Sequence, residues 1–516
     1  MSSLFWDLGS TGGCTEAEKI RELTLKLSRS RVLIAGDIDF GMMEGIDIDL
    51  LVAKVKERED GKAGMQILDK TALEGIMEGL RAEKSPMPIE VVRPSGFRPF
   101  ASEVEPSYEI GRRDTEKTGG TVADFVSHFN DRLERLRHIL ETHSMGTGGA
   151  VASLEVASKL TSGREIVVTG IVLQKITTKN GNIMAVLEDE TGSAKVMFMK
   201  GSSQQAASLF AKASTLVNDE VIAVKGKISG PFIMAGEIIW PDIPIREQKK
   251  TEEDIAIAFI SDIHVGSKFF MEKNFLHMIK WLNGANGGGH NGLAGKIKYL
   301  VVGGDAVDGV GVYPQQEKSL SIPDVYSQYK VLLNLMDSVP DYIEVFIIPG
   351  NHDAVQRAEP QPAFDDEITG DFKRDNIHFL PNPITLKLHK IDVLSYHGTS
   401  LDSVISAIPN MSYATPEKAM VEVLKRRHLS PIYGGNVIMP NRYDKLVIDK
   451  APDILHMGHI HKNGIDAYHG TTIINSGTWQ ARTDFQVRQG HIPTPCIMPV
   501  METKRRIVSS IDFNTG

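Results

Sequence analysis

The fold is decided by one stretch, Val345-Phe346-Ile347-Ile348-Pro349-Gly350-Asn351-His352-Asp353. Its apolar and β-branched beginning predicts a buried strand, and the Pro-Gly pair predicts the turn that ends it. Three side chains that can bind a metal, those of Asn351, His352 and Asp353, follow immediately. Taken alone, these residues could also be a turn capped by Asn and Asp, with an incidental histidine. Residues that follow the other predicted strands show which of the two interpretations, a metal site or a capped turn, is favoured.

Other predicted strands in this half of the chain end in the same way. Strand 255–260 runs into Asp262 and His264, strand 299–302 into Asp305 and Asp308, strand 392–396 into His397, and strand 453–457 into His459 and His461. Ligands collect at strand ends in open α/β sheets. Each motif alone has an ordinary explanation, as a turn or as chance. Together, each after a buried strand, they predict one shared site.

The residue types at these strand ends are suited to two divalent cations. Two such ions about 3.5–4 Å apart need a bridging ligand, and a carboxylate bridges best, so we expect Asp305 to be shared. One ion would be completed by Asp262, His264 and His461, and the other by Asn351, His397 and His459. The mixture of imidazole and oxygen ligands favours manganese, iron or zinc over magnesium or calcium. We expect manganese, with iron, zinc or magnesium as alternatives.

Composition limits the class of protein. A chain of 516 residues is too long for one compact core, so several domains are expected. No stretch approaches the length of a membrane span, and the first residues lack the features of a secretory signal. The two cysteines, Cys14 and Cys496, exclude a disulfide framework. We therefore expect a cytosolic protein without a membrane partner. The net charge of −9 argues against coating nucleic acid through bulk positive charge, but not against gripping it locally.

Changes of pattern divide the chain into segments. We expect a small helical domain over 1–80, a proline-rich linker over 81–120, a helix with a connector over 121–162, an all-β barrel over 163–248 and an α/β sandwich over 249–516. The N-terminal domain could serve as a docking module or as a structural cap. Apolar residues at helical spacing after Thr121 predict core packing for the helix that follows.

The barrel is predicted from its short strands and turns. Strands are expected at 166–172, 184–189, 194–198, 221–227 and 237–240, with a helix at 204–213 between the third and fourth. This pattern is typical of an oligonucleotide/oligosaccharide-binding (OB) fold. Such barrels can bind single strands through aromatic residues in a basic groove. Aromatic residues are few here, so a protein-docking or spacer role is favoured over direct strand binding.

The strand-end motifs resemble those of the calcineurin-like metallophosphoesterases. The matching residues are Asp262-x-His264, Gly304-Asp305, Gly350-Asn351-His352-Asp353, His397-Gly398 and Gly458-His459-x-His461. The resemblance implies the same metal ligands as above. It also implies that His352 is no ligand but faces the substrate and protonates the leaving oxygen, and that Asp353 orients it. Asp308 and His456 are candidates for supporting roles, although ordinary core or turn roles would also suit them.

The order of barrel and phosphoesterase narrows the resemblance to the small subunits of archaeal family D DNA polymerases. Further matching stretches are 313–317, 357–362 and 424–434, and the resemblance covers about residues 120–516. It implies a proofreading 3′→5′ exonuclease that acts on single-stranded or mismatched DNA 3′ ends. The partner would be a large polymerase subunit, in a heterodimer or heterotetramer.

Other interpretations remain at this stage. Related eukaryotic subunits have lost their metal ligands and act as scaffolds, whereas this sequence keeps every ligand. A stand-alone phosphodiesterase for a small substrate would have little need of a barrel. Candidate phosphate contacts are Arg357, Lys425, Arg426 and Arg427, which could instead be a solvated surface run.

Overall fold

The computed structural model describes residues 97–112, 118–144, 151–285, 291–370, 372 and 374–514, with short pieces before residue 77. The chain divides into two compact units, Met1–Glu90 and Val91–Gly516. In the first unit, β1 (Val32–Ile34) pairs in parallel with β2 (Gln66–Leu68). Most of the helical domain predicted over 1–80 lies outside the described residues. Across the part of the chain that is described, no helix is long and apolar enough to cross a membrane.

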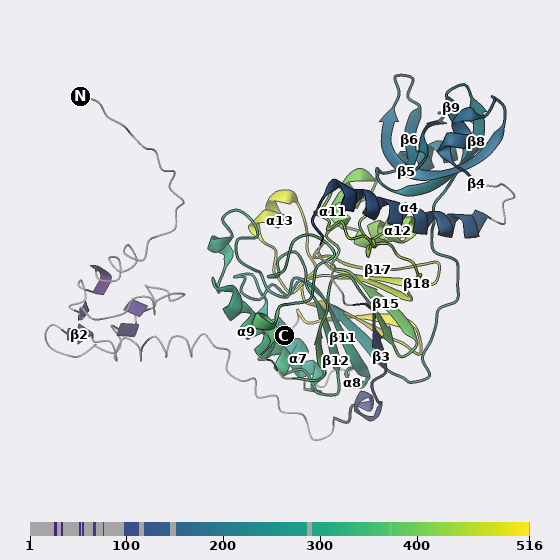
Figure 1. Ribbon diagram of the computed structural model, residues 1–516. Helices are drawn as coiled ribbons and strands as arrows, with labels where there is room; N and C mark the ends of the chain where they lie inside the picture. The colour runs from purple at the N-terminus through teal and green to yellow at the C-terminus, as the bar shows by residue number, and fades with distance from the viewer. Residues whose placement is uncertain are drawn as a thin grey trace, which may run out of the picture. The chain divides into compact units, whose positions relative to one another are not determined.

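The C-terminal part of the second unit is a sandwich of two six-stranded sheets (Figure 1). One sheet has the order β13 (Ile377–Phe379), β12 (Glu344–Ile348), β11 (Ile297–Gly303), β10 (Ala256–Ile260), β19 (Ile497–Glu502), β20 (Ile507–Asp512). The other has the order β17 (Asn463–Tyr468), β18 (Thr471–Ser476), β16 (Ile454–Met457), β15 (Ile391–Ser395), β14 (Ile384–Leu388), β3 (Tyr108–Ile110). Fully buried Phe259 and Phe346 of the first sheet share one core cluster with Leu386 and Ile454 of the second. The predicted α/β sandwich is confirmed.

Helices cover the sandwich. They are α7 (Glu272–Leu282), α8 (Asn291–Ala294), α9 (Val325–Asp337), α10 (Asp366–Thr369), α11 (Leu401–Ala407), α12 (Pro416–Arg426) and α13 (Asp484–Gln489). Helix α12 packs against β17 and β18, and its Met420 and Val423 are fully buried in one core cluster with Leu455 and Ile473. Parallel pairing of β10, β11 and β12 brings the carboxyl ends of these strands to one edge, where the predicted ligands lie.

A closed barrel of five strands precedes the sandwich. Its strands are β5 (Glu165–Thr177), β6 (Ile183–Asp189), β7 (Gly192–Phe198), β8 (Val221–Ser229) and β9 (Phe232–Ile239). They follow the order β5-β6-β7-β9-β8, and pairing of β8 with β5 closes the ring. Helix α6 (Gln204–Ser214) lies between the third and fourth strands, as predicted. β4 (Val151–Ala152) and α5 (Leu154–Lys159) lead into the barrel.

Helix α4 (Val122–Ser144) contacts both the barrel and the sandwich. Its Leu133, Leu136 and Leu140 are buried in one cluster with residues of β5 and β8 and with Val447, so the predicted core role is confirmed for the C-terminal part of the helix. Val122 and Val126 near its start are 82% and 54% exposed. Its buried Arg132 donates to Asp444 Oδ2 at 2.9 Å. A cap forms at the start of the helix, where the Asp124 backbone N–H donates to Thr121 Oγ1 at 3.3 Å and the Thr121 backbone N–H donates to Asp124 Oδ2 at 2.9 Å.

Part of the predicted linker over 81–120 is built into the sandwich, so the prediction is wrong for that part. Strand β3 pairs antiparallel with β14. The backbone of Ser107 exchanges hydrogen bonds with the Tyr299 hydroxyl, at 2.9 and 3.1 Å. The prolines of this stretch obscured the strand because its pairing partner lies far away in the sequence, where no local pattern can reveal it.

Candidate metal centre

The predicted ligands meet at the strand ends, and many stand in a backbone conformation that is uncommon for them. Positive φ values are found at Asp262 (51°), His264 (53°), Asp305 (49°), His459 (66°) and His461 (58°). Each such residue costs on the order of 1–3 kcal/mol, and such residues cluster at functional sites. The surrounding fold therefore holds these side chains in place at the expense of stability.

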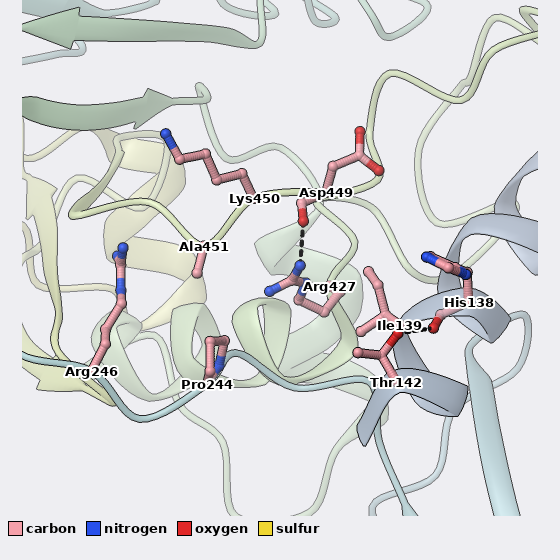
Figure 2. Close-up of a pocket in the computed structure, with 9 residues that line it drawn as sticks. All are labelled: His138, Ile139, Thr142, Pro244, Arg246, Arg427, Asp449, Lys450 and Ala451. Carbon is pink, nitrogen blue, oxygen red and sulfur yellow. Dashed lines mark hydrogen bonds between the residues drawn. The ribbon is translucent and has the colours of Figure 1, made fainter. Parts of the chain in front are cut away.

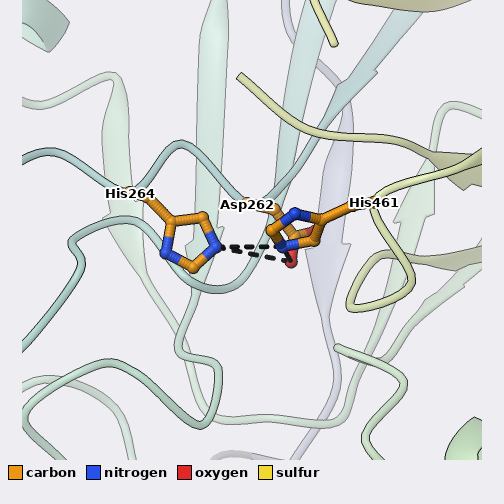
Figure 3. A group of neighbouring side chains, drawn as sticks. All are labelled: Asp262, His264 and His461. Atoms are coloured by element: carbon orange, nitrogen blue, oxygen red, sulfur yellow. Dashed lines mark hydrogen bonds and ion pairs between the residues drawn. The ribbon is translucent and has the colours of Figure 1, made fainter. Parts of the chain in front are cut away.

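One group of metal-capable side chains consists of Asp262, His264 and His461 (Figure 3). The two Nε2 atoms of His264 and His461 lie 3.0 Å apart, and His461 Nε2 lies 3.2 Å from Asp262 Oδ1. The far side of the His264 ring is held by Asp308, whose Oδ1 lies 3.0 Å from Nδ1. These are the three residues that the sequence assigned to one ion.

The second group consists of Asp305, His397 and His459. His397 Nε2 lies 3.4 Å from Asp305 Oδ2 and 3.0 Å from Asn351 Oδ1. Asp305 also faces the first group, with its Oδ2 atom 3.9 Å from His264 Nε2. Asp305 thus lies between the two groups, as expected of a shared ligand.

The donor set fits divalent cations. His397 Nδ1 donates to the carbonyl of Gly303 at 2.9 Å, so the Nε2 of a neutral ring offers a lone pair. That lone pair faces only the oxygen atoms of Asn351 and Asp305, which are acceptors too. Within the described residues, no lysine or arginine lies within 4.0 Å of the Asp262 or Asp305 carboxylate. Buried carboxylates require a compensating positive charge. Since no permanently charged side chain among the described residues supplies it here, bound cations would do so.

The pKa values point the same way. Burial lowers the pKa of the His264 and His397 imidazoles, but the surrounding carboxylates outweigh it. The hydrogen bond to Asp308 and the charge of Asp305 raise the pKa of His264 to about 9. The charge of Asp305 and its hydrogen bond raise the pKa of His397 to about 10. Protons would occupy these rings until a cation replaced them.

His352 belongs with His264 and Asp305 to a third metal-capable group. Its ring stands perpendicular to that of His264, with centroids 4.7 Å apart. The Nδ1 atom donates to the carbonyl of Asp308 at 2.8 Å, so in a neutral ring Nε2 carries the lone pair. The side chain is 17% exposed, in contrast to the buried His264 and His397. His352 is therefore the histidine of this group that solvent can reach most readily.

Asp353 does not orient His352, contrary to prediction. Its carboxylate accepts hydrogen bonds from the backbone N–H groups of Gly350 at 2.8 Å and Ala306 at 3.2 Å. It also accepts from the Tyr329 hydroxyl at 3.0 Å. Burial first, and then the charge of Asp305, raise the pKa of Asp353 to about 6. Asp353 ties the loop after β12 to the loop after β11, and the contact to the His352 ring comes from Asp308.

Supporting residues were partly missed by sequence reasoning. Asp308 was a candidate and is confirmed as the partner of His264. Asp402 in α11 was not found, yet its Oδ2 atom lies 2.9 Å from His459 Nε2. Gln486 in α13 was not found either, and its amide lies 2.8 Å from His461 Nδ1. A single Asp or Gln in an amphipathic helix carries no local sign of such a contact.

The basic residues expected at phosphates have different positions. Arg357 is exposed and donates to the carbonyls of Gly311 and Val312, both at 3.2 Å. Lys425 Nζ lies 3.9 Å from the centre of the Trp240 ring, where it joins α12 to the barrel. Arg426 is 1% exposed, with its Nε atom 2.8 Å from Glu220, and it also pairs with Glu422. Arg426 is thus a structural ion-pair residue and not a phosphate contact.

Arg427 is 5% exposed and lies in a cavity of about 340 Å³. Figure 2 shows it beside Ile139 and Thr142 of α4, with its guanidinium donating to the backbone carbonyl of Asp449. Burial lowers the pKa of Arg427 to about 10. None of the residues that line this cavity belongs to the metal-capable groups. The predicted phosphate contact therefore does not form part of the candidate metal centre.

Comparisons with known proteins agree with this arrangement. The family model for calcineurin-like phosphoesterases matches residues 255–463. The chain is 43% identical to the DNA polymerase II small subunit of Methanocaldococcus jannaschii over 386 residues, which cover 74% of this chain and 64% of that protein. It is 42% identical to the subunit of the same name from Archaeoglobus fulgidus over 378 residues, which cover 73% of this chain and 74% of that one. The chain belongs to the DNA polymerase II small subunit family.

A third member of this family, from Methanothermobacter thermautotrophicus, is 37% identical over 401 residues, which cover 77% of this chain and 80% of that one. The resemblance inferred from the strand-end motifs is thus confirmed. The C-terminal part of the chain has the metallophosphoesterase fold, and its metal-capable groups suit a divalent cation site. The match spans just under two thirds of the length of the M. jannaschii protein.

Proposed function

We propose that this protein is a 3′→5′ exonuclease that proofreads for a large polymerase subunit. The observation that carries the proposal is the complete set of buried carboxylates and imidazoles, which no lysine or arginine among the described residues neutralises. A scaffold would have no need to maintain five strained residues and unneutralised buried charges. The subunit would assemble with its large partner as a heterodimer or heterotetramer.

The ligand roles follow the two groups. Asp262, His264 and His461 would hold one cation, Asn351, His397 and His459 the other, and Asp305 would contact both. When bound, two divalent cations, most suitably manganese, polarise a phosphoryl oxygen and lower the pKa of water. His459 is oriented by Asp402 and His264 by Asp308, because each carboxylate meets the ring nitrogen that faces away from the centre.

His352 would act on the substrate. Its Nδ1 atom is held by the Asp308 carbonyl, which directs Nε2 away from that loop. In exonucleolytic cleavage the leaving group is the 3′ oxygen of the penultimate nucleotide, and His352 Nε2 would give it a proton. Burial lowers the pKa of the His352 imidazole, which disfavours the protonated form, and the negative charge of a bound phosphate would favour that form. Arg357 would contact a substrate phosphate from the exposed side of the same loop.

Selection of errors would come from the ease of unpairing. A mismatched 3′ end frays at a lower free-energy cost than a matched one, which gives preference without base contacts. The five-stranded barrel has the strand order and helix position of an OB fold, and it would hold the phosphoesterase next to the polymerase. That role is supported by Arg426 and Lys425, which bind the barrel tightly to α12.

The proposal is tested with the full chain, alone and with its large partner. Each is incubated with Mn²⁺ and a primer that carries either a matched or a mismatched 3′ end, and the released nucleoside monophosphate is quantified. We expect faster release from the mismatched primer and none from the Asp305→Ala variant. Absence of release by the wild type in both forms would contradict the proposal and favour a scaffold. Hydrolysis of small phosphodiesters without cleavage of the primer would favour a stand-alone phosphodiesterase.

A further inference from the structure

The rim of the candidate metal centre carries aromatic rings, and one of them is Tyr313. It follows β11 and is 39% exposed. Its ring centroid lies 6.1 Å from that of His352, with an angle of 59° between the ring planes. Arg357 donates to the carbonyl of the preceding residue, Val312, at 3.2 Å. An aromatic face and an exposed cation thus lie together next to the histidine that is proposed to act on the leaving oxygen.

A second aromatic surface lies beside His459. Tyr413 and His491 stack on each other, with centroids 4.3 Å apart and an angle of 30° between planes. Burial and the charge of Asp402 raise the pKa of the Tyr413 hydroxyl to about 12, so the two side chains lie close together, and Asp402 in turn lies 2.9 Å from His459 Nε2. The stacked pair is therefore connected to a metal-capable histidine through one carboxylate.

Exposed apolar side chains occur in α13 and just after it. Phe485 and Val487 in α13 are 59% and 54% exposed, and both flank Gln486, whose amide meets His461. Ile492, next to His491, is 68% exposed. Three large apolar side chains are therefore exposed in and just after the helix that supports His461.

The basic residues that the sequence predicted at phosphates supply little exposed positive charge. Of the basic residues expected at phosphates, Arg426 is paired inside the protein, Lys425 covers Trp240 and Arg427 lies in a separate cavity. Arg357 is the exposed member of that set. With a net charge of −9, the chain has little bulk attraction for a polyanion. Stacking of bases on aromatic side chains, worth about 1–3 kcal/mol per base, can take its place.

We propose that Tyr313 and the Tyr413–His491 pair stack on the bases of an unpaired DNA 3′ end. The inference rests on the proposed exonuclease function and names its substrate as single-stranded polymer. Since His352 would serve the leaving oxygen of the penultimate nucleotide, the neighbouring Tyr313 takes the penultimate base. The Tyr413–His491 pair takes the terminal one. Paired bases hide their faces inside the duplex stack, so a matched end can bind only after it has unpaired.

The test measures binding by the full chain in EDTA, so that no cleavage occurs. A fluorescent oligonucleotide with an unpaired 3′ end is titrated with the wild type, Tyr313→Ala, Tyr313→Phe and Tyr326→Ala. Tyr326 is the control, since it is 55% exposed on α9 and bonds to Glu367 at 3.3 Å. We expect Tyr313→Ala to weaken binding about tenfold or more. Tyr313→Phe, which keeps the ring, and Tyr326→Ala should bind like the wild type.

A second oligonucleotide that lacks the penultimate base separates stacking from a structural effect. On it, the wild type and Tyr313→Ala should bind equally. The proposal would be overturned if the wild type and Tyr313→Ala bound the intact oligonucleotide equally. It would also be overturned if their affinities for the abasic oligonucleotide differed as much as those for the intact one. Failure of the exonuclease function would appear instead as absent nucleotide release by the wild type with Mn²⁺, and the binding measurement would still decide the stacking.

Discussion

Two buried clusters of histidine and aspartate in this protein have similar composition and different character. One is the candidate metal centre at the strand ends. The other joins α4 to the loop before β16, where Asp444 Oδ2 lies 2.9 Å from Arg132 Nε, 2.9 Å from His428 Nε2 and 3.2 Å from His128 Nε2. All four side chains of this second cluster are at most 2% exposed.

The clusters differ in where their positive charge comes from. Burial would raise the pKa of Asp444, but His428 and Arg132 hold it well below its usual range. Asp444 is neutralised by a permanent cation of the chain itself. The positively charged groups that lower the pKa values of Asp262 and Asp305 are imidazoles. The two clusters are therefore distinguished by the source of the charge that neutralises their carboxylates, and not by their numbers of His and Asp residues.

The largest effect is expected at the shared ligand. Asp305→Ala removes the carboxylate that faces both groups, so Mn²⁺ binding should fall below detection for both ions in isothermal titration calorimetry. Asp466→Ala in β17 is the control, because that carboxylate is exposed and lies in a different strand. Retention of one tight Mn²⁺ site by Asp305→Ala would show that the two groups do not share this ligand.

The structural cluster should respond in stability. Asp444→Ala leaves Arg132 buried without its carboxylate, and breaking such a pair costs about 3–5 kcal/mol. Urea unfolding followed by tryptophan fluorescence should report a lower free energy of unfolding, while Mn²⁺ binding by the folded variant stays at the wild-type level. Loss of Mn²⁺ affinity in this variant would mean that the two clusters are not separate.

A smaller effect is expected where the metal centre is supported from outside. Asp402→Asn keeps an oxygen near His459 Nε2 but removes the charge that holds the ring. Loss of such a support weakens metal affinity by roughly 10–100-fold. Asp484→Asn is the control, since Asp484 is an exposed residue at the start of α13, and it should leave the Mn²⁺ affinity measured by calorimetry unchanged. Equal Mn²⁺ affinities of the wild type, Asp402→Asn and Asp484→Asn would show that Asp402 does not support the metal centre.

The smallest effect is the pH dependence of the structural cluster. Ser430 N–H donates to His428 Nδ1 at 3.0 Å, so the ring is held neutral, and burial lowers the pKa of His428 to about 4. The unfolded chain takes up this proton near pH 6.5, so it binds more protons than the folded state between pH 6.5 and 4. Stability therefore falls as pH falls, by about 2 kcal/mol from pH 7 to 5.

That contribution is isolated by difference. His428→Gln lacks the titrating ring, so its free energy of unfolding should change less between pH 7 and 5 than that of the wild type. Parallel pH profiles of the two proteins would show that His428 does not titrate as its contacts imply.

The comparison also explains what the sequence could predict. The strand ends were predictable because each motif is local, with an apolar strand followed at once by ligands, and the barrel strands were predictable for the same reason. The structural cluster was not, because Arg132 and Asp444 are far apart in the chain. The same distance hid the pairing of β3 with β14 and the burial of Arg426 against Glu220. A contact between residues far apart in the chain produces no periodic pattern in the local sequence.

Within the metal centre, local motifs predicted which residues gather but not every contact. Asp353 stands next to His352 in the chain and was expected to orient it, yet its carboxylate faces backbone N–H groups of two loops. The direction of a side chain at a tight turn depends on φ and on neighbouring loops, and the sequence pattern contains neither.

We propose that this centre is catalytic, and a substitution of His352 separates catalysis from metal binding. His352 lies outside the two ligand groups assigned to the cations, so His352→Ala should still bind Mn²⁺. The measurement is single-turnover release of the 3′-terminal nucleotide at saturating Mn²⁺. Because proton transfer by a positioned side chain contributes about 10²–10⁴-fold to a rate, we expect His352→Ala to release the nucleotide more slowly by a factor of that size. Release by His352→Ala at the wild-type rate would contradict it.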